Sequence, residues 1–166
     1  SGKVVELGHG YNGEVVYALI ELSLSNSMLH VAKSAEEFCI NAEINRSKIK
    51  KQLDLLISEG KEIAIWGGTG KAAAFINQYS ADAERFPLVV DSDESKSGTY
   101  VPGTGQLIQH CNKLAELCVD VIIIPSQWRA LDIIEEITQK KITFNSVLIE
   151  HNGGLVDFLN ENHPYA

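Results

Sequence analysis

Four short apolar runs mark the second part of the chain, and polar or amphipathic stretches separate them. We predict that the runs are strands of a buried sheet, because short apolar segments between glycine, proline or polar residues are typical of strands covered on both faces. They span residues 62–66, 86–90, 120–124 and 143–149. Helices are predicted between them, over residues 72–79, 110–117 and 128–140, with Leu131, Ile134 and Ile137 facing inward. Strands that alternate with helices favour an α/β domain whose mainly parallel sheet has right-handed crossovers.

A long helix is predicted ahead of this sheet. Ser34 and Glu37 have the spacing of a capping box, which satisfies the first backbone N–H groups of a helix. Apolar residues then recur at helical intervals to about Ser58, and Gly60 is a natural C-terminal stop. We therefore expect one helix from Ser34 to Ser58 that bridges two domains or packs across the sheet.

The two ends of the chain give weaker patterns. Residues 3–13 are rich in glycine and are predicted to form a loop. The segment Glu14–Ser25 is apolar and fits either an edge strand or the start of a helix, and a short helix is predicted around Val156–Leu159. These boundaries divide the chain into an N-terminal segment, residues 1–33, and an α/β domain, residues 34–166.

Composition narrows the choice of partners and compartment. The formal net charge of −8 over 166 residues argues against nucleic acid or an anionic membrane as the main partner. No run approaches the roughly 20 apolar residues of a membrane span. Cys39, Cys111 and Cys118 share no C-x-x-C spacing, so we predict reduced, mostly buried thiols in a cytoplasmic protein, and no zinc site.

The glycine-rich turn after the first strand carries the main chemical signal. It runs Gly67, Gly68, Thr69, Gly70, Lys71 and leads directly into a good helix former. In a strand–turn–helix unit of this kind, glycines without side chains allow a phosphate to approach the backbone N–H groups of the turn. The phosphate then lies at the positive end of the helix dipole. The structural alternative is that these glycines only make a tight turn.

Two nucleotide-binding motifs compete at this turn. A P-loop is rejected because Ala72 occupies the position of its required Ser or Thr, and its first glycine is missing. Gly68, Gly70 and Ala73 instead satisfy the dinucleotide pattern G-x-G-x-x-A. Asp91 ends the next apolar run, at about the spacing of an acidic residue that binds a ribose hydroxyl.

Three strand ends carry distinctive residues, at 67–71, 91–105 and 125–128. Because ligands of parallel sheets bind beyond the carboxyl ends of the strands, we expect these stretches to converge. Within them the sequence resembles the C-terminal domain of the sugar C-methyltransferases, which act on nucleotide-linked deoxysugars. The first turn keeps the glycine and lysine of that family, and Asn77 matches an asparagine further along the helix.

The second and third stretches extend the resemblance. The family pattern Val-Asp followed by Lys-x-Gly-x-Tyr-x-Pro-Gly-Thr is matched at Val90-Asp91 and at residues 96–104, and Ile-Pro is matched at Ile124-Pro125. The resemblance covers roughly residues 34–140. It departs at residues 72–74, where three alanines replace the usual Gly-Asn-Thr, after the third strand, and in the tail from Glu150.

The resemblance implies a Rossmann-like domain that follows a class I S-adenosylmethionine-binding domain. It implies that this chain is a fragment that holds a nucleotide-sugar or another phosphorylated molecule, binds no cofactor itself and does no chemistry alone. S-adenosylmethionine is implied only for the full-length transferase, and Glu14–Ser25 would be the last strand of its methyltransferase core.

Individual residues receive ligand roles on this basis. Lys71 would contact a phosphate, Asp91 a sugar hydroxyl, and Tyr100 and Trp128 would stack on a base or sugar. Each has a structural alternative: a surface lysine, a turn-forming aspartate and two core aromatics. No catalytic residue is predicted, because Ser126, His110 and His151 have no recognisable partner. The predicted ligand-binding residues are Gly67, Gly68, Thr69, Gly70, Lys71, Asp91, Lys96, Tyr100, Pro102, Gly103, Thr104, Ser126 and Trp128.

Two other functions remain open at this point. An NAD(P)-binding oxidoreductase domain would use the same Gly68, Gly70 and Asp91, but the third strand ends in Pro-Ser-Gln-Trp, without an evident catalytic residue. A non-catalytic interaction module would keep the fold without the ligand, and the alanines at residues 72–74 favour that alternative.

Overall fold

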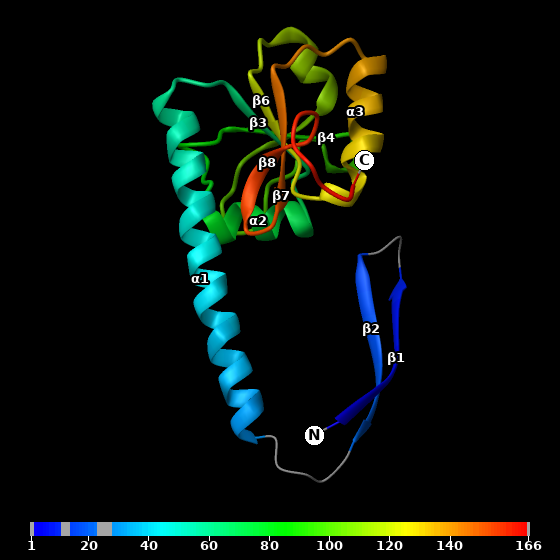
Figure 1. The fold of residues 1–166 in the computed structure, drawn as a ribbon. Helices are drawn as coiled ribbons and strands as arrows, with labels where there is room; N and C mark the ends of the chain where they lie inside the picture. Colours follow the sequence, from blue (N-terminus) through cyan, green and yellow to red (C-terminus); the bar gives the residue numbers. More distant parts are fainter. Residues whose placement is uncertain (1, 11–13, 23–27, 166) are drawn as a thin grey trace. The chain divides into compact units, whose positions relative to one another are not determined.

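The computed structural model describes residues 2–10, 14–22 and 28–165. Contacts divide the chain into two compact units, Ser1–Glu43 and Ile44–Ala166, which are described separately (Figure 1). The division falls within the long helix α1 (Met28–Ser58).

The first unit contains an antiparallel hairpin of β1 (Gly2–Gly10) and β2 (Val15–Leu22). The expected loop over residues 3–13 is therefore wrong up to Gly10, and residues 11–13 lie outside the described chain. The apolar segment after Glu14 is a strand up to Leu22, and its last residues lie outside the described chain. Tyr17 pairs with Gly8 and donates a hydrogen bond to Glu6 Oε1 at 2.8 Å, so a cross-strand aromatic ring compensates for the missing side chain.

Helix α1 begins at Met28, six positions before the expected capping box. Ser34 therefore lies inside the helix, and the predicted N-terminal boundary is wrong. The C-terminal boundary at Ser58 is confirmed, and Gly60 adopts a φ of +68°, which favours glycine after a helix. In the part of α1 that belongs to the second unit, Ile49 and Leu53 are fully buried.

The second unit is built on a six-stranded sheet with the order β5-β4-β3-β6-β7-β8. The predicted strands are confirmed as β3 (Ile63–Trp66), β4 (Leu88–Asp91), β6 (Val121–Ile123) and β7 (Ser146–His151). Their pairing is parallel, as expected, and only β8 (Gly154–Asp157) runs antiparallel, beside β7.

Two strands of this sheet differ from the prediction. The edge strand β5 (Ile108–His110) was not predicted, since three residues that end in Gln-His carry little periodic signal. The tail forms β8 and not the short helix expected around Val156–Leu159, because Leu148–His151 of β7 offers an open edge for pairing.

Side chains that alternate along the strands supply two cores, one on each face of the sheet. Ile63 and Ile65 of β3 pack with α1 and with α2 (Lys71–Tyr79). Ala64 and Trp66 pack on the opposite face with α3 (Ala130–Gln139) and with the 3₁₀ helix η3 (Cys111–Glu116). The second unit is thus a three-layer, Rossmann-like α/β domain, as predicted (Figure 1).

Some predicted burials are wrong. Helix α3 buries Ala130, Ile133 and Ile137, whereas Leu131 is exposed because the packed face of the helix is the one that carries Ile133 and Ile137. Of the cysteines only Cys111 is buried; Cys39 and Cys118 are exposed.

Candidate functional site

The carboxyl ends of β3, β4 and β6 meet, as expected for neighbouring parallel strands, and form a small pocket. Its volume is about 80 Å³, well below the roughly 300–1,000 Å³ of pockets that enclose a whole small-molecule ligand. The pocket therefore suits one small group of a larger ligand. Its lining residues are Trp66, Gly67, Thr69, Ala72, Asp91, Ser92, Lys96, Ser126, Arg129 and Ile133.

The glycines of the turn after β3 have different physical roles. Gly67 and Gly70 adopt φ values of +100° and +56°, which other residues rarely adopt. Gly68 is required by packing, since a β-carbon there would lie 2.2 Å from Ile108 Cδ1. Of these three, only Gly67 lines the pocket, and its N–H already donates to Val90 O at 2.6 Å. The dinucleotide-like spacing is thus explained in part by packing of the turn against β5.

Helix α2 starts directly after this turn without a capping side chain. Gly70 is its N-cap, and no acidic residue occupies its first turn. The positive end of its dipole therefore lies next to the pocket, although the Ala72 N–H already donates to Thr69 O at 3.2 Å and Asp91 also lines the pocket.

Asp91 and Lys96 form an ion pair within the pocket. Lys96 Nζ lies 3.1 Å from Asp91 Oδ2, and the Asp93 N–H donates to Asp91 Oδ1 at 3.0 Å. Asp91 is buried, so this pairing compensates for its desolvation. The neighbouring Asp93 carboxylate accepts hydrogen bonds from the side chain and the backbone of Ser95. These bonds, together with the nearby charge of Lys96, lower the pKa of Asp93 below its usual value.

Basic residues approach the pocket from the other strand ends. Lys71 Nζ donates to Gln127 Oε1 at 2.5 Å and so connects the start of α2 with the turn after β6. Arg129 lines the pocket, and in the described part of the chain no carboxylate pairs with its guanidinium. Sequence reasoning missed Arg129 and Ser92, although each follows a predicted strand by a few residues.

The loop residues of the family-like pattern have partners within the fold. Asn77 Nδ2 donates to Pro102 O at 2.8 Å, and a β-carbon on Gly103 would lie 2.2 Å from Asn77 Oδ1. Thr104 donates to Gln106, whose amide in turn donates to Ala81 O and Phe86 O. These contacts fix the loop against α2, and none of these residues lines the pocket.

The structure brings together only part of the predicted site. Gly67, Thr69, Asp91, Lys96 and Ser126 line one pocket. Gly68 and Gly70 belong to the adjoining turn, Lys71 is the first residue of α2, and Pro102, Gly103 and Thr104 form the loop beyond it. Tyr100 is 65% exposed and Trp128 is partly exposed, and neither lines this pocket.

The described residues contain neither a metal-binding cluster nor a membrane-spanning helix. In residues 2–10, 14–22 and 28–165, no three His, Cys, Asp or Glu side chains are grouped so that they could hold a metal ion. In the same ranges, none of the helices has the length and apolar character needed to cross a membrane.

Comparison with known proteins agrees with the geometry of the second unit. No curated protein matches the chain. The family model described as the C-methyltransferase C-terminal domain matches residues 14–149, which include the β3, β4 and β6 ends and most of the six-stranded sheet. The chain therefore belongs to the C-methyltransferase C-terminal domain family.

Proposed function

We propose that the second unit binds the phosphate-bearing part of a nucleotide-linked sugar for a C-methyltransferase and transfers no methyl group itself. The observation that carries this proposal is the Arg129 guanidinium, which lines a pocket between strand ends and has no ion-pair partner among the described residues. A guanidinium offers paired donors that match phosphate oxygens, and its bonds to phosphate are charge-assisted.

The rest of the pocket is chemically suited to the same group. Thr69 and Ser126 add hydroxyl donors, and the uncapped N-terminus of α2 adds oriented N–H groups. Lys96 adds a second cation, which is paired with Asp91 at 3.1 Å and lies 3.8 Å from Asp93 Oδ2. A volume of about 80 Å³ suits a phosphate and not a dinucleotide, so the sugar and the base would extend outside the pocket.

Calorimetric titration of the 166-residue chain tests the proposal. The ligands are nucleoside diphosphates, their sugar conjugates, inorganic phosphate, NAD, NADP and S-adenosylmethionine. Arg129→Gln should weaken binding of the nucleotide-sugar about 10- to 100-fold, since a hydrogen bond to a charged group contributes roughly 1.5–3 kcal/mol. Lys51→Gln, on the exposed face of α1, removes the same charge elsewhere in the unit and should leave the affinity unchanged.

Each outcome of this titration has a defined meaning. Binding of a nucleotide-sugar that depends on Arg129 supports the proposal. Binding of NAD or NADP alone would replace it with the oxidoreductase alternative. Absence of binding to all of these ligands, in a chain that melts cooperatively, would favour an interaction module.

We also propose that residues 1–33 form the end of a preceding methyltransferase domain. The hairpin exposes apolar side chains on both of its faces, as the regularly paired neighbours Val15 and Val16 illustrate with exposed fractions of 46% and 57%. A two-stranded hairpin is marginally stable alone, and apolar residues on both faces are typical of strands inside a covered sheet. The methyltransferase domain would supply that cover and would bind S-adenosylmethionine.

Hydrogen exchange tests the placement of the hairpin. Amides of β1 and β2 should exchange rapidly in the 166-residue chain and slowly in a polypeptide that carries the natural sequence preceding it. Equal exchange in the two proteins would refute this placement. Protection that grows with the concentration of the short chain alone would instead indicate a dimer made through the hairpin.

A further inference from the structure

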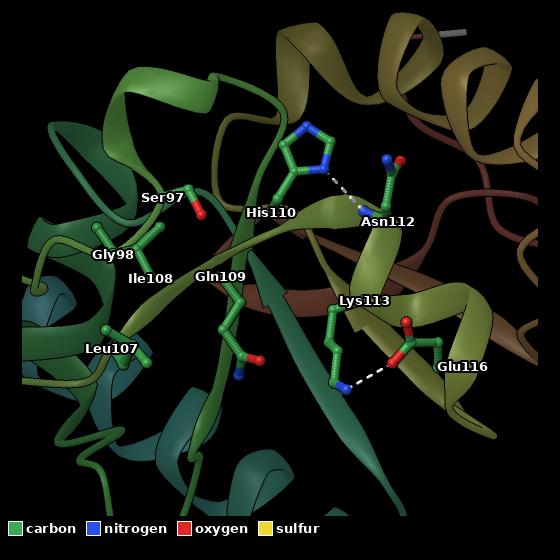
Figure 2. A pocket seen from close by; sticks show the side chains of 9 residues that line it. All are labelled: Ser97, Gly98, Leu107, Ile108, Gln109, His110, Asn112, Lys113 and Glu116. Atoms are coloured by element: carbon green, nitrogen blue, oxygen red, sulfur yellow. Dashed lines mark hydrogen bonds and ion pairs between the residues drawn. The ribbon is translucent and has the colours of Figure 1, made fainter.

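A second, larger cavity lies along the edge strand β5 and has a volume of about 360 Å³ (Figure 2). One wall contains Ser97, Gly98 and Leu107, and the other is the exposed face of η3 with Lys113 and Glu116. Its volume is in the range of pockets that hold a small organic ligand. This groove shares no residue with the pocket at the β3 end, although Ser92 and Lys96 of that pocket precede Ser97 in the same loop.

The groove offers polar groups that the fold does not use. The Gln109 amide is half-buried and has no hydrogen-bond partner among the described residues. His110 Nδ1 accepts the Asn112 N–H at 3.3 Å, so a neutral ring carries its proton on Nε2 and can donate from there. Because successive strand residues point to opposite faces, Gln109 and His110 flank the edge from its two sides (Figure 2).

The charges of the groove cancel. Lys113 Nζ lies 2.6 Å from Glu116 Oε2, so the cation that faces the groove is already paired. A phosphate here would compete with Glu116 and meet its negative charge. The groove therefore favours a neutral, hydrogen-bonding ligand over an anion.

An extended peptide is disfavoured by the backbone of the same edge. Ile108 donates to Thr99 O and accepts from Gly98 N, both at 2.9 Å, so the loop already occupies these positions of the open strand. Adding a strand here would require that loop to leave.

An exposed aromatic residue is paired with one of the residues that line the groove. Tyr100 forms an antiparallel bridge with Leu107, and directly paired residues project to the same face of a sheet. Its ring is 65% exposed, and Leu107 beside it lines the groove. Apolar surface next to unpaired amide and imidazole donors matches a pyranose ring, which has C–H faces and a rim of hydroxyls.

We infer that the β5 groove is a binding site for a neutral monosaccharide, with Gln109 and His110 contacting hydroxyls and Tyr100 covering a C–H face. The inference extends the proposed function, since a nucleotide-linked sugar carries such a group. It is tested separately on free monosaccharides, which do not need the Arg129 pocket.

The test is a titration of the ¹⁵N-labelled 166-residue chain with free D-glucose and L-rhamnose, followed by amide chemical shifts. Shifts should concentrate in residues 97–100 and 107–113 and saturate at roughly millimolar sugar. Gln109→Leu and Tyr100→Ala should each weaken binding about fivefold, the effect of one net hydrogen bond or one modest ring contact. Gln139→Leu, at the exposed end of α3, is the matched control and should have no effect.

Several results would overturn the inference. They are the absence of saturable shifts, shifts outside these residues, affinities unchanged by both groove variants, or a response to free nucleosides and not to sugars. Arg129→Gln separates the two proposals, because it should weaken nucleotide-sugar binding and leave monosaccharide shifts intact. If monosaccharides bind while no nucleotide-sugar depends on Arg129, the function proposed above fails and the groove remains a sugar site.

Discussion

Gly103 leaves just enough space for the side chain of Asn77. A β-carbon at residue 103 would lie 2.2 Å from Asn77 Oδ1, and the Asn77 amide donates to Pro102 O and to Ala73 O, both at 2.8 Å. One asparagine thus joins α2 to the loop that follows β4. The Asn and Pro-Gly of the family-like pattern therefore have a structural role in this chain that needs no ligand.

This contact predicts a large effect of Gly103→Ala. Gly103 has a φ of +92°, so a side chain would add roughly 1–2 kcal/mol of backbone strain to about 1–3 kcal/mol of overpacking. We expect the free energy of unfolding to fall by roughly 2–5 kcal/mol in urea titrations. Gly105→Ala is the matched control, because its φ is +75° and its β-carbon would meet nothing within 4 Å. Gly105→Ala should therefore lower the free energy of unfolding only by the backbone strain, roughly 1–2 kcal/mol.

The Asn77 contact can be isolated with a double mutant. Asn77→Ala should cost about 1–2 kcal/mol, since it removes two hydrogen bonds, one within α2 and one that joins α2 to the loop. In that background Gly103→Ala should become less costly, because the clash is gone. Strictly additive effects would contradict the packing role assigned to Gly103.

A second prediction concerns the glycine turn after β3. Gly68→Ala should destabilise the second unit by about 1–3 kcal/mol, because its β-carbon would lie 2.2 Å from Ile108 Cδ1 and 2.4 Å from Cγ1. Ile108→Ala alone should cost about 2–5 kcal/mol, as for other fully buried large-to-small changes. Denaturant unfolding of the double mutant should show a cost about 1–3 kcal/mol below the sum. If the cost of the double mutant equalled the sum of the two single costs within error, packing against Ile108 would not be the reason that residue 68 is glycine.

These two glycines illustrate what the sequence could predict. The apolar runs predicted β3, β4, β6 and β7, because burial on both faces of a parallel sheet leaves an unbroken hydrophobic signal. The rule that ligands lie beyond strand ends then predicted that Gly67, Asp91 and Ser126 would meet, and they line one pocket. Whether a given glycine serves a ligand or a neighbour could not be predicted, since Ile108 lies forty positions from Gly68.

The missed elements depend on long-range pairing. Strand β1 contains Gly2, Gly8 and Gly10, and local propensity favours a loop there, but pairing with β2 overrides it. Arg129 was missed because the phase of α3 decides which residue after β6 faces the pocket. That phase is set by packing of Ile133 and Ile137 and not by local sequence.

Thiol chemistry gives a third prediction, because the cysteines differ in exposure. Cys39 and Cys118 are exposed, and Cys111 is fully buried with its Sγ 3.4 Å from Glu136 Oε1. Iodoacetamide at pH 8 should alkylate Cys39 and Cys118 in the folded chain and Cys111 only in denaturant, as read by peptide mass spectrometry. Rapid alkylation of Cys111 under native conditions would show that this side of the sheet opens.

The same thiol predicts how stability changes in alkaline solution. Burial, together with the hydrogen bond to Glu136 and its negative charge, raises the pKa of Cys111 to about 11 from an ordinary value of 9.0. Below pH 9 the thiol is protonated in both states. Between about pH 9 and pH 11 the unfolded chain loses the proton while the folded chain keeps it, so stability falls as pH rises.

Tyr79 should act in the same direction. Burial, the hydrogen bond to Glu150 Oε1 at 2.8 Å and the charge of that carboxylate raise the pKa of its phenol. The unfolded phenol, with an ordinary pKa of 10.0, therefore ionises first. Urea unfolding at pH 8, 9, 10 and 11 in reductant should show a decline that is shallower in Cys111→Ala and in Tyr79→Phe. Each variant is compared with its own free energy of unfolding at pH 8, so that the packing change caused by the substitution cancels. If the pH dependence of each variant ran parallel to that of the unmodified chain, neither buried group would resist ionisation.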